Sequence, residues 1–358
     1  MDTEGGPVGP AADARTPREC FEIFFPPEML TKLTKCTNIH IASFLEELPL
    51  AKRRKMKENR KDYLHVKETD EIEMAAFIGM FYIRGLLQQN YWERDRLFSD
   101  LTGHPDLQQQ CQGIGSPSST VTSIWNDPGT REFRWRTDRF AACREIFEEW
   151  NDNCAASLQA GDYLAVDECL YAMRNRLAFK QYNKNKPAKY GLLFKQLNSV
   201  RVPFTHRSEV YAGKPVEEGK YYVKGVEEIT LRLIDKYSEF CEVKGRNVSF
   251  DNLYTSIPLA IELQERGMTC IGTVKFNRRG VPKEIRDMTG REENSSIIWY
   301  EKEKNKMSLT SYVVNTKSKG KKNVIILSTK PVLLGVTKDD GKAKPAIVRL
   351  HQSWDGYS

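Results

Sequence analysis

Two aspartates follow apolar runs and could share a metal ion. Asp167 comes directly after the run YLAV, and Asp251 comes directly after the run NVSF. Ligand sites in α/β sheets collect at the carboxyl ends of strands, so neighbouring strands would bring these two carboxylates together. Facing carboxylates are tolerated mainly when a divalent cation offsets their repulsion, and hard oxygen ligands favour Mg²⁺ or Mn²⁺ over zinc. The pair therefore indicates a site for a hard divalent cation.

A structural interpretation of the same aspartates stays open. Asp167 could cap a turn, and Asp251 could cap a helix beginning near Tyr254, because aspartate is a common capping residue. Metal-assisted phosphoryl transfer also asks for more than this pair offers. Two metal ions about 4 Å apart, held by three or more carboxylates, stabilise both the attacking and the leaving oxygen. Two aspartates are one ligand short of that arrangement.

Basic segments provide candidate contacts to nucleic acid. In the run FKQYNKNKPAKY, lysines that could bind phosphates alternate with Tyr182 and Tyr190, which could stack on bases. A second basic run is KFNRRG, and a third is TKSKGKKN at 316–323. The candidate DNA-binding residues are Lys180, Lys184, Lys186, Lys189, Lys275, Arg278 and Arg279. The alternative is that these runs are solvated loops.

The composition agrees with a polyanionic partner without requiring one. A formal net charge of +7 and an isoelectric point near 8.8 favour attraction to phosphate backbones, although an ordinary basic protein has the same values. The run AKRRKMKENRK at 51–61 is typical of a nuclear localisation signal, or of a charged helix face. The apolar run at 74–87 is too short for a bilayer and carries Arg84, so we expect a buried helix and no membrane partner.

Other chemistries find no support in the sequence. The five histidines are isolated, and the sequence contains neither a Gly-x-Ser-x-Gly elbow nor a P-loop lysine pattern. The eight cysteines are scattered, with no Cys-x-x-Cys pair. We therefore expect no zinc site in this chain, and reduced thiols.

The hydrophobic pattern divides the chain into five segments. Apolar residues recur at helical spacing early in the chain, and short β-branched runs alternating with helical runs follow. The order indicates an α/β domain with a mixed sheet. We expect a disordered tail at 1–17, a helical N-terminal region at 18–158 interrupted by a loop at 108–123, an α/β core at 159–275, a β-rich basic insertion or subdomain at 276–345, and a divergent end at 346–358.

Four sequence blocks resemble the piggyBac transposase family. They are LAVDECL, NKNKPAKYGLLFK, VSFDNLYTSIPLA and GTVKFNRRGVPKEI, in the order of that family. The resemblance implies an RNase H-like core, with Asp167 and Asp251 as the first two residues of a catalytic aspartate triad that uses Mg²⁺ or Mn²⁺ for DNA cleavage and strand transfer. It also implies transposon ends and TTAA targets as DNA partners, a nuclear location, and compatibility with a homodimer.

The end of the sequence departs from the family pattern. There the third aspartate follows a block like Tyr-Asn-x-Thr-Lys-Gly-Gly-Val-Asp, whereas this chain reads RLHQSWDGYS. Alignment places Ser358 at the triad position and Asp355 three residues early. From this likeness we expect no third catalytic aspartate, a missing final core helix, no zinc module, and a truncated, inactive copy. The alternatives are an active transposase completed by Asp355 or by residues in trans, a non-catalytic DNA-binding remnant, and a domesticated protein-interaction module.

Overall fold

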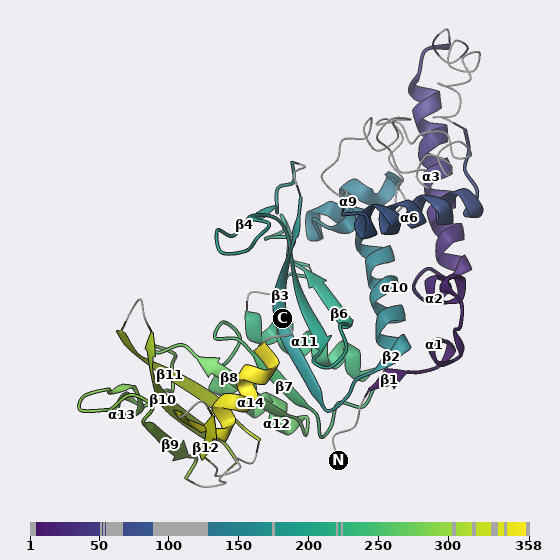
Figure 1. Cartoon of the computed structure of the whole chain (residues 1–358). Coiled ribbons are helices and arrows are strands. Elements are labelled where there is room, and N and C mark those ends of the chain that lie inside the picture. The colour runs from purple at the N-terminus through teal and green to yellow at the C-terminus, as the bar shows by residue number, and fades with distance from the viewer. Residues whose placement is uncertain are drawn as a thin grey trace. The chain divides into compact units, whose positions relative to one another are not determined.

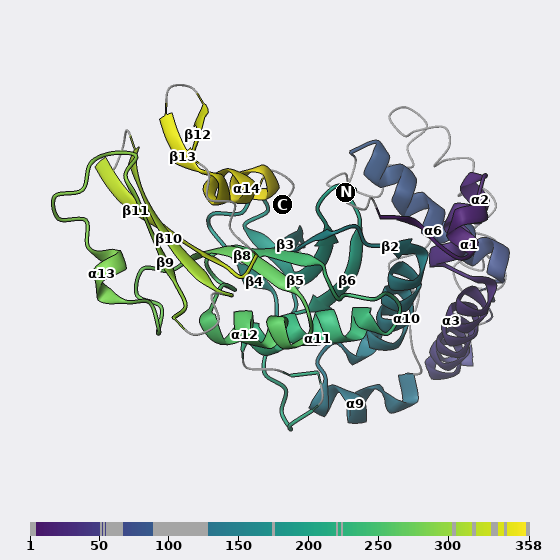
Figure 2. The ribbon, with the colours of Figure 1, turned by 90° about the horizontal axis from the view of Figure 1, so that it is seen from below.

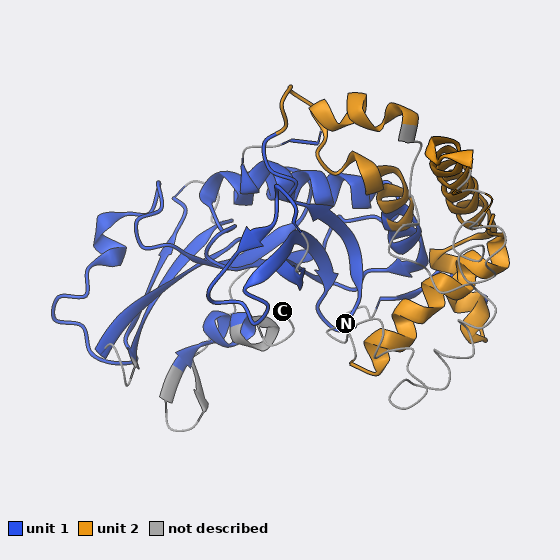
Figure 3. Cartoon of the chain, turned by 90° about the horizontal axis from the view of Figure 1, so that it is seen from above, with its two compact units in different colours: residues 1–14, 151–214, 220–358 blue, residues 15–150, 215–219 orange. Residues whose placement is uncertain are grey.

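The fold is known from a computed structural model of the whole chain (Figure 1). It describes residues 5–50, 52, 54, 67–88, 128–173, 176–219, 221–222, 225–302, 306–316, 320–330, 336–339 and 342–355. These residues form two compact units (Figure 3). The first contains 1–14, 151–214 and 220–358, and the second contains 15–150 and 215–219. The expected loop at 108–123 lies outside the described residues, as does 51–61 apart from Lys52 and Arg54.

The second unit is helical. A capping box starts its first helix, because the Thr16 hydroxyl accepts from the Glu19 amide while Glu19 accepts from the Thr16 amide. Its core joins Met29 and Leu33 to Met74, Ile78 and Ile146. The expected helical N-terminal region is confirmed for the described residues. The elements are α2 (Pro17–Phe24), α3 (Pro27–Glu47), α6 (Glu71–Leu86), the 3₁₀ helix η1 (Pro128–Thr130), α9 (Arg131–Thr137) and most of α10 (Ala141–Ser157).

Helix α6 covers most of the apolar run at 74–87. Met74, Ile78 and Met80 are buried, as expected of a core helix. Phe81 and Leu86 are exposed, so only one stripe of this apolar helix meets the core. Among the helices in the described part of the chain, none is long and apolar enough to cross a membrane.

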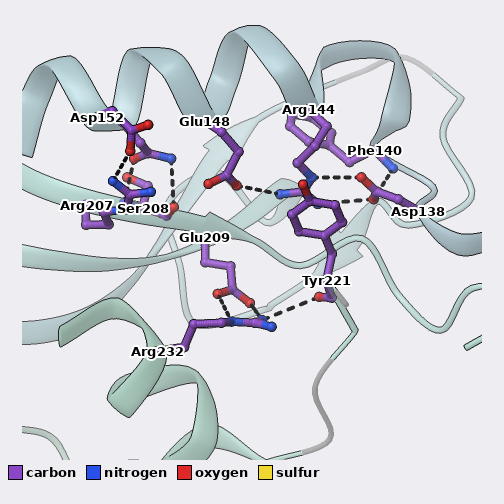
Figure 4. A network of polar contacts seen from close by, with 11 residues as sticks. Asp138, Phe140, Arg144, Glu148, Asp152, Arg207, Ser208, Glu209, Tyr221 and Arg232 are labelled. Atoms are coloured by element: carbon purple, nitrogen blue, oxygen red, sulfur yellow. Dashed lines mark hydrogen bonds and ion pairs between the residues drawn. The ribbon is translucent and has the colours of Figure 1, made fainter. Parts of the chain in front are cut away.

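A buried ion pair holds the start of α10 in the second unit (Figure 4). Arg144 donates from Nε to Asp138 Oδ2 at 2.7 Å and from Nη2 to Asp138 Oδ1 at 3.1 Å. A third donor of Arg144 meets Glu148 at 3.3 Å, and Asp138 also accepts from the Phe140 amide. This fork-shaped pairing satisfies a charge that burial would otherwise make costly.

The first unit is built on a nine-stranded mixed sheet (Figure 1). The strand order is β4-β5-β3-β7-β8-β11-β10-β9, with β6 paired to β5. The strands are β3 (Tyr163–Ala172), β4 (Gln181–Tyr182), β5 (Tyr190–Ser199), β6 (Thr205–Val210), β7 (Asn247–Phe250), β8 (Thr269–Val274), β9 (Ser296–Tyr300), β10 (Ser308–Thr316) and β11 (Gly320–Ser328).

The central strands have the RNase H-like arrangement. Strand β5 pairs antiparallel with both β3 and β6, and β7 and β8 add to the other side of β3 in parallel. The parallel additions need crossovers, which α11 (Val226–Ser238) and α12 (Ile257–Glu265) provide. The predicted α/β fold with a mixed sheet is thus confirmed.

The insertion after β8 is part of the same sheet. Strand β11 pairs antiparallel with β8, with Ile325 opposite Val274, and β10 and β9 follow. The sequence left open whether this region was a separate subdomain, and the pairing answers that question. The remaining short elements are the helix α13 (Lys283–Arg286) and the hairpin of β12 (Val336–Asp339) and β13 (Lys342–Pro345).

Helices cover both faces of the sheet (Figure 2). Helices α11 and α12 pack Leu233 and Leu259 into a core with Leu164, Val166 and Phe250 from the strands. On the other face, α14 (Ala346–Asp355) packs Ile347 and Val348 against Val200, Ile271, Tyr312 and Ile326. The alternation of strand side chains assigns each strand residue to one of these two faces.

Polar contacts tie β6 to two helices within the first unit (Figure 4). The Asn151 side chain of α10 makes two hydrogen bonds to the Ser208 backbone, at 2.8 and 3.0 Å. Arg207 pairs with Asp152, and Glu209 pairs with Arg232 of α11. These contacts join β6 to α10 and α11.

Two predictions about the chain ends are wrong. The tail at 1–17 is structured from Gly5 onward, because β1 (Gly6–Pro7) pairs with β2 (Leu158–Gln159) and is followed by α1 (Pro10–Asp13). The expected loss of a final core helix is also wrong, since α14 follows the insertion and packs on the sheet. In both segments a few apolar contacts and backbone bonds, which composition does not reveal, order the chain.

Candidate metal and DNA site

The sheet brings Asp167 and Asp251 to neighbouring positions. Strands β3 and β7 run parallel, and Val166 lies opposite Phe250 in the register. Asp251 is the first residue after β7, whereas Asp167 lies inside β3, which continues to Ala172. Adjacent strands are about 4.8 Å apart, so the two residues lie side by side. The two strands are neighbours as expected, but Asp167 does not end its strand, because β3 continues beyond it and pairs with β5 as far as Ala172. The catalytic role of the aspartates stays a prediction.

The two aspartates lie on the face of the sheet that α14 covers. Val166 and Phe250 point into the core beneath α11 and α12, so the residues that follow them take the opposite face. Ala165, two residues before Asp167, packs in the cluster that contains Ile347 of α14. His351 of the same helix lies 3.4 Å from the Phe250 carbonyl oxygen through Nε2.

A tight turn fixes the Asp251 side chain. Its Oδ1 accepts from the Leu253 amide at 2.8 Å and from the Tyr254 amide at 3.3 Å, while its carbonyl accepts from the Thr255 amide and hydroxyl. Helix α12 begins later, at Ile257, with Ser256 as its N-cap. Asp251 therefore caps a turn and not the helix, and the cap engages only one carboxylate oxygen.

A third carboxylate, Glu168, stands beside the pair on the opposite face. Burial raises the pKa of Glu168, and the charges of Asp251 and Asp167 add to that rise. Lys195 opposes it from the facing position on β5. Burial in turn lowers the pKa of the Lys195 ammonium, an effect that the Glu168 charge opposes.

Sequence reasoning missed Glu168 and Lys195. The adjacency of Glu168 to Asp167 was visible in the sequence. The lysine opposite it depends on the strand register, which local patterns do not give.

Tyr254 lies close to all three carboxylates. The residue is fully buried in the core under α12. Burial raises the pKa of its hydroxyl well above the ordinary value, and the charges of Glu168, Asp167 and Asp251 raise it further. One phenol thus lies within electrostatic reach of all three carboxylates.

The donor set is suited in type, and only partly in number, to a divalent cation. Asp167 and Asp251 offer hard oxygen ligands from one face, as Mg²⁺ and Mn²⁺ prefer. Within the described ranges, however, no group of three or more His, Cys, Asp or Glu side chains is arranged to hold a metal ion. Asp355 belongs to α14, but its side chain lies outside the described residues.

The predicted DNA-binding lysines fall into different environments. Lys184 and Lys189 are exposed on the loop between β4 and β5. Lys186 lies half-buried and donates from Nζ to the Glu168 carbonyl oxygen at 2.9 Å, which places its ammonium beside the acidic cluster. Lys180 lies over the Tyr190 ring, 5.8 Å from its centroid.

Two exposed tyrosines accompany these lysines. Tyr182 and Tyr190 face each other from β4 and β5, with ring centroids 4.7 Å apart. Both side chains are more than half exposed, at 59% and 55%. Exposed aromatic rings next to cations are the combination that single-stranded nucleic acid uses for stacking.

The run KFNRRG is also divided by the structure. Lys275 and Arg279 are exposed. Arg278 instead turns inward and donates to the carbonyl oxygens of Leu253, Tyr254 and Thr255. Its guanidinium thus binds backbone carbonyls of the Asp251 turn through Nε and Nη2, and its role as a phosphate contact stays a prediction.

The chain matches a known family over most of its length. A family described as Transposase IS4 matches residues 16–109 and 124–353. Among human proteins, the chain is 22% identical over 267 residues to PiggyBac transposable element-derived protein 3, covering 73% of this chain and 40% of that protein. It is 22% identical over 267 residues to the Chimeric ERCC6-PGBD3 protein, covering 73% of this chain and 22% of that one. The chain thus spans well under half of either relative.

A solved structure has the same fold. The cryo-EM structure of a piggyBac transposase synaptic complex with hairpin DNA matches with a TM-score of 0.78 and 22% sequence identity. The match covers 99% of this chain and 69% of that chain. At this identity the likeness establishes the fold.

Proposed function

This chain belongs to the Transposase IS4 family and is similar to piggyBac-type proteins, and from that premise we propose that it binds DNA and a divalent cation beside Asp167 and Asp251. The observation that carries the proposal is the parallel register of β3 and β7, which sets the aspartates side by side on one face. The DNA partners would be transposon ends and TTAA targets, encountered in the nucleus.

The residues around the aspartates support cation binding. Asp251 is held by two backbone amides through Oδ1, so its carboxylate is oriented in advance. Lys186 places a positive charge at the edge of the acidic cluster, where a phosphate group would be attracted. A bound Mg²⁺ or Mn²⁺ would supply Lewis-acid stabilisation of a phosphate and of the attacking oxygen.

Strand cleavage asks for more than this pair of ligands. In-line displacement at two metal ions uses three or more carboxylates, and the described residues contain no group of three or more side chains arranged to hold a metal ion. Losing roughly 4 kcal/mol of transition-state stabilisation slows a step about a thousandfold. We therefore propose that the chain by itself binds DNA and metal without cleaving DNA. Robust cleavage that depends on Asp167 would show that Asp355 or a second chain completes the site.

DNA binding is tested by its salt dependence. Fluorescence anisotropy with a labelled duplex should give a log affinity that falls linearly with log salt, because phosphate contacts release counterions. Lys184→Ala and Lys189→Ala should each weaken binding similarly for all sequences and flatten the slope by about one unit. Salt-independent binding would exclude the DNA-phosphate interface and favour a protein-interaction module.

Lys186 has an expected outcome distinct from these two lysines. Its ammonium already contacts the Glu168 carbonyl oxygen, so it supplies less to sequence-independent affinity in the absence of metal. Lys186→Ala should therefore change the metal-free salt slope less than Lys184→Ala does. Equal slopes for the two variants would place Lys186 among the general phosphate contacts.

A further inference from the structure

We propose that Arg278 is a positioning residue for Asp251. The role rests on the proposed metal site, because Asp251 matters as a ligand only if a cation binds there. The three contacts of the Arg278 guanidinium come from one short stretch of chain. Nε donates to the Thr255 carbonyl oxygen at 3.0 Å, and Nη2 donates to those of Leu253 at 2.9 Å and Tyr254 at 3.5 Å.

The same three residues hold Asp251 from the other side. The amides of Leu253 and Tyr254 donate to Asp251 Oδ1, and the amide and hydroxyl of Thr255 donate to its carbonyl oxygen. The N–H groups of this turn therefore meet the aspartate, while its carbonyl groups meet the arginine. A planar guanidinium with several donors suits this task better than a single ammonium.

Arg278 is itself anchored. Its backbone amide donates to the Lys275 carbonyl at 2.9 Å, and its carbonyl accepts from the Val281 amide at 3.3 Å and from Arg286 Nη2 at 3.3 Å. Gly280, at φ 88°, allows the chain to turn back between them. The segment after β8 thus presents a fixed guanidinium to the Asp251 turn.

Arg279 provides a matched control. It is the next residue in the same basic run, and it is exposed. If Arg278 acts through the turn, alanine substitutions at the two arginines should have different effects. Arg278→Ala should affect the turn and the metal, whereas Arg279→Ala should affect only DNA affinity and its salt slope.

The first measurement is amide hydrogen exchange of the full chain without metal. Arg278→Ala should raise exchange in the segment containing Leu253, Tyr254 and Thr255, while Arg279→Ala should leave it unchanged. Hydrogen exchange therefore shows whether Arg278 stabilises the Asp251 turn, even if no cation binds. Unchanged exchange in Arg278→Ala would overturn the positioning role.

The second measurement is Mn²⁺ titration followed by electron paramagnetic resonance. Loss of Mn²⁺ binding in Asp167→Ala and Asp251→Ala would establish the proposed site. If the unaltered chain does not bind Mn²⁺, the proposed function is refuted, and the hydrogen-exchange result still decides the role of Arg278. Given the site, Arg278→Ala should weaken Mn²⁺ affinity about tenfold or more, as removal of groups that orient metal ligands does.

Rescue completes the test. Arg278→Lys should give an intermediate Mn²⁺ affinity, because an ammonium reaches fewer of the three carbonyls, and melting curves in EDTA identify any variant that fails to fold. Mn²⁺ affinity that stays unchanged in Arg278→Ala, or a salt slope flattened as much as in Arg279→Ala, would return Arg278 to the DNA-contact class.

Discussion

Replacing Asp251 with asparagine and with alanine should separate its two roles, turn cap and metal ligand. Asparagine keeps an oxygen able to accept from the Leu253 and Tyr254 amides, which lie 2.8 and 3.3 Å from Oδ1. Alanine removes that acceptor. Loss of a comparable cap costs about 1 kcal/mol, within a range of about 0.5–2 kcal/mol. Asparagine thus removes only the charge, whereas alanine removes both the charge and the cap.

Without metal, Asp251→Asn should be at least as stable as the unaltered chain, and Asp251→Ala should be less stable than both. Asparagine also removes one negative charge beside Asp167 and Glu168, whose mutual repulsion opposes folding. For a chain of this size 1 kcal/mol corresponds to about 2 °C in melting temperature. Differential scanning fluorimetry in EDTA resolves such a difference.

Saturating Mn²⁺ should make the unaltered chain more stable than Asp251→Asn. At about 100 times its dissociation constant, a ligand that binds only the folded state adds about 2.7 kcal/mol of stability. The unaltered chain should gain this, while both variants should gain far less, because neither has the Asp251 carboxylate. An asparagine variant as unstable as alanine in EDTA would refute the cap, and one stabilised by Mn²⁺ as much as the unaltered chain would refute the ligand role.

Two further predictions concern buried positions of the first unit. Gly272→Ala should lower the free energy of unfolding by about 1–3 kcal/mol, and the urea midpoint with it, because the added Cβ would lie 2.8 Å from the Phe250 carbonyl oxygen and closer still to Thr255 Oγ1. An unchanged midpoint would contradict that packing. Burial lowers the pKa of His206 to about 4. The unfolded chain therefore takes up a proton on this histidine at a higher pH than the folded chain does. The stability that neutral His206 contributes is thus fully present above pH 6.5 and is lost as the pH falls from 6.5 toward 4. This amounts to about 3 kcal/mol, and the unfolding free energy of His206→Phe should vary less over that window.

Local patterns in the sequence determined the elements that carry the site. The run NVSF forms β7, and Asp251 follows it as expected, whereas the run YLAV is only the first part of β3, which continues through Asp167 to Ala172. Apolar residues also recur at helical spacing along 226–240, and this segment forms α11, which buries Ile229, Leu233 and Tyr237. Phe240 lies past the helix end and is exposed. Such features are readable because burial acts on side chains only a few residues apart.

Tertiary structure alone decided which of these residues meet. The register of β3 with β7 pairs Val166 with Phe250 across more than eighty residues of chain, and that of β3 with β5 pairs Glu168 with Lys195. The fold also turned Arg278 inward to backbone carbonyls while leaving Arg279 exposed, although the two are chemically identical neighbours in the sequence. Strand pairing and backbone capping join groups distant in sequence, and their free energy depends on geometry that no local spacing specifies.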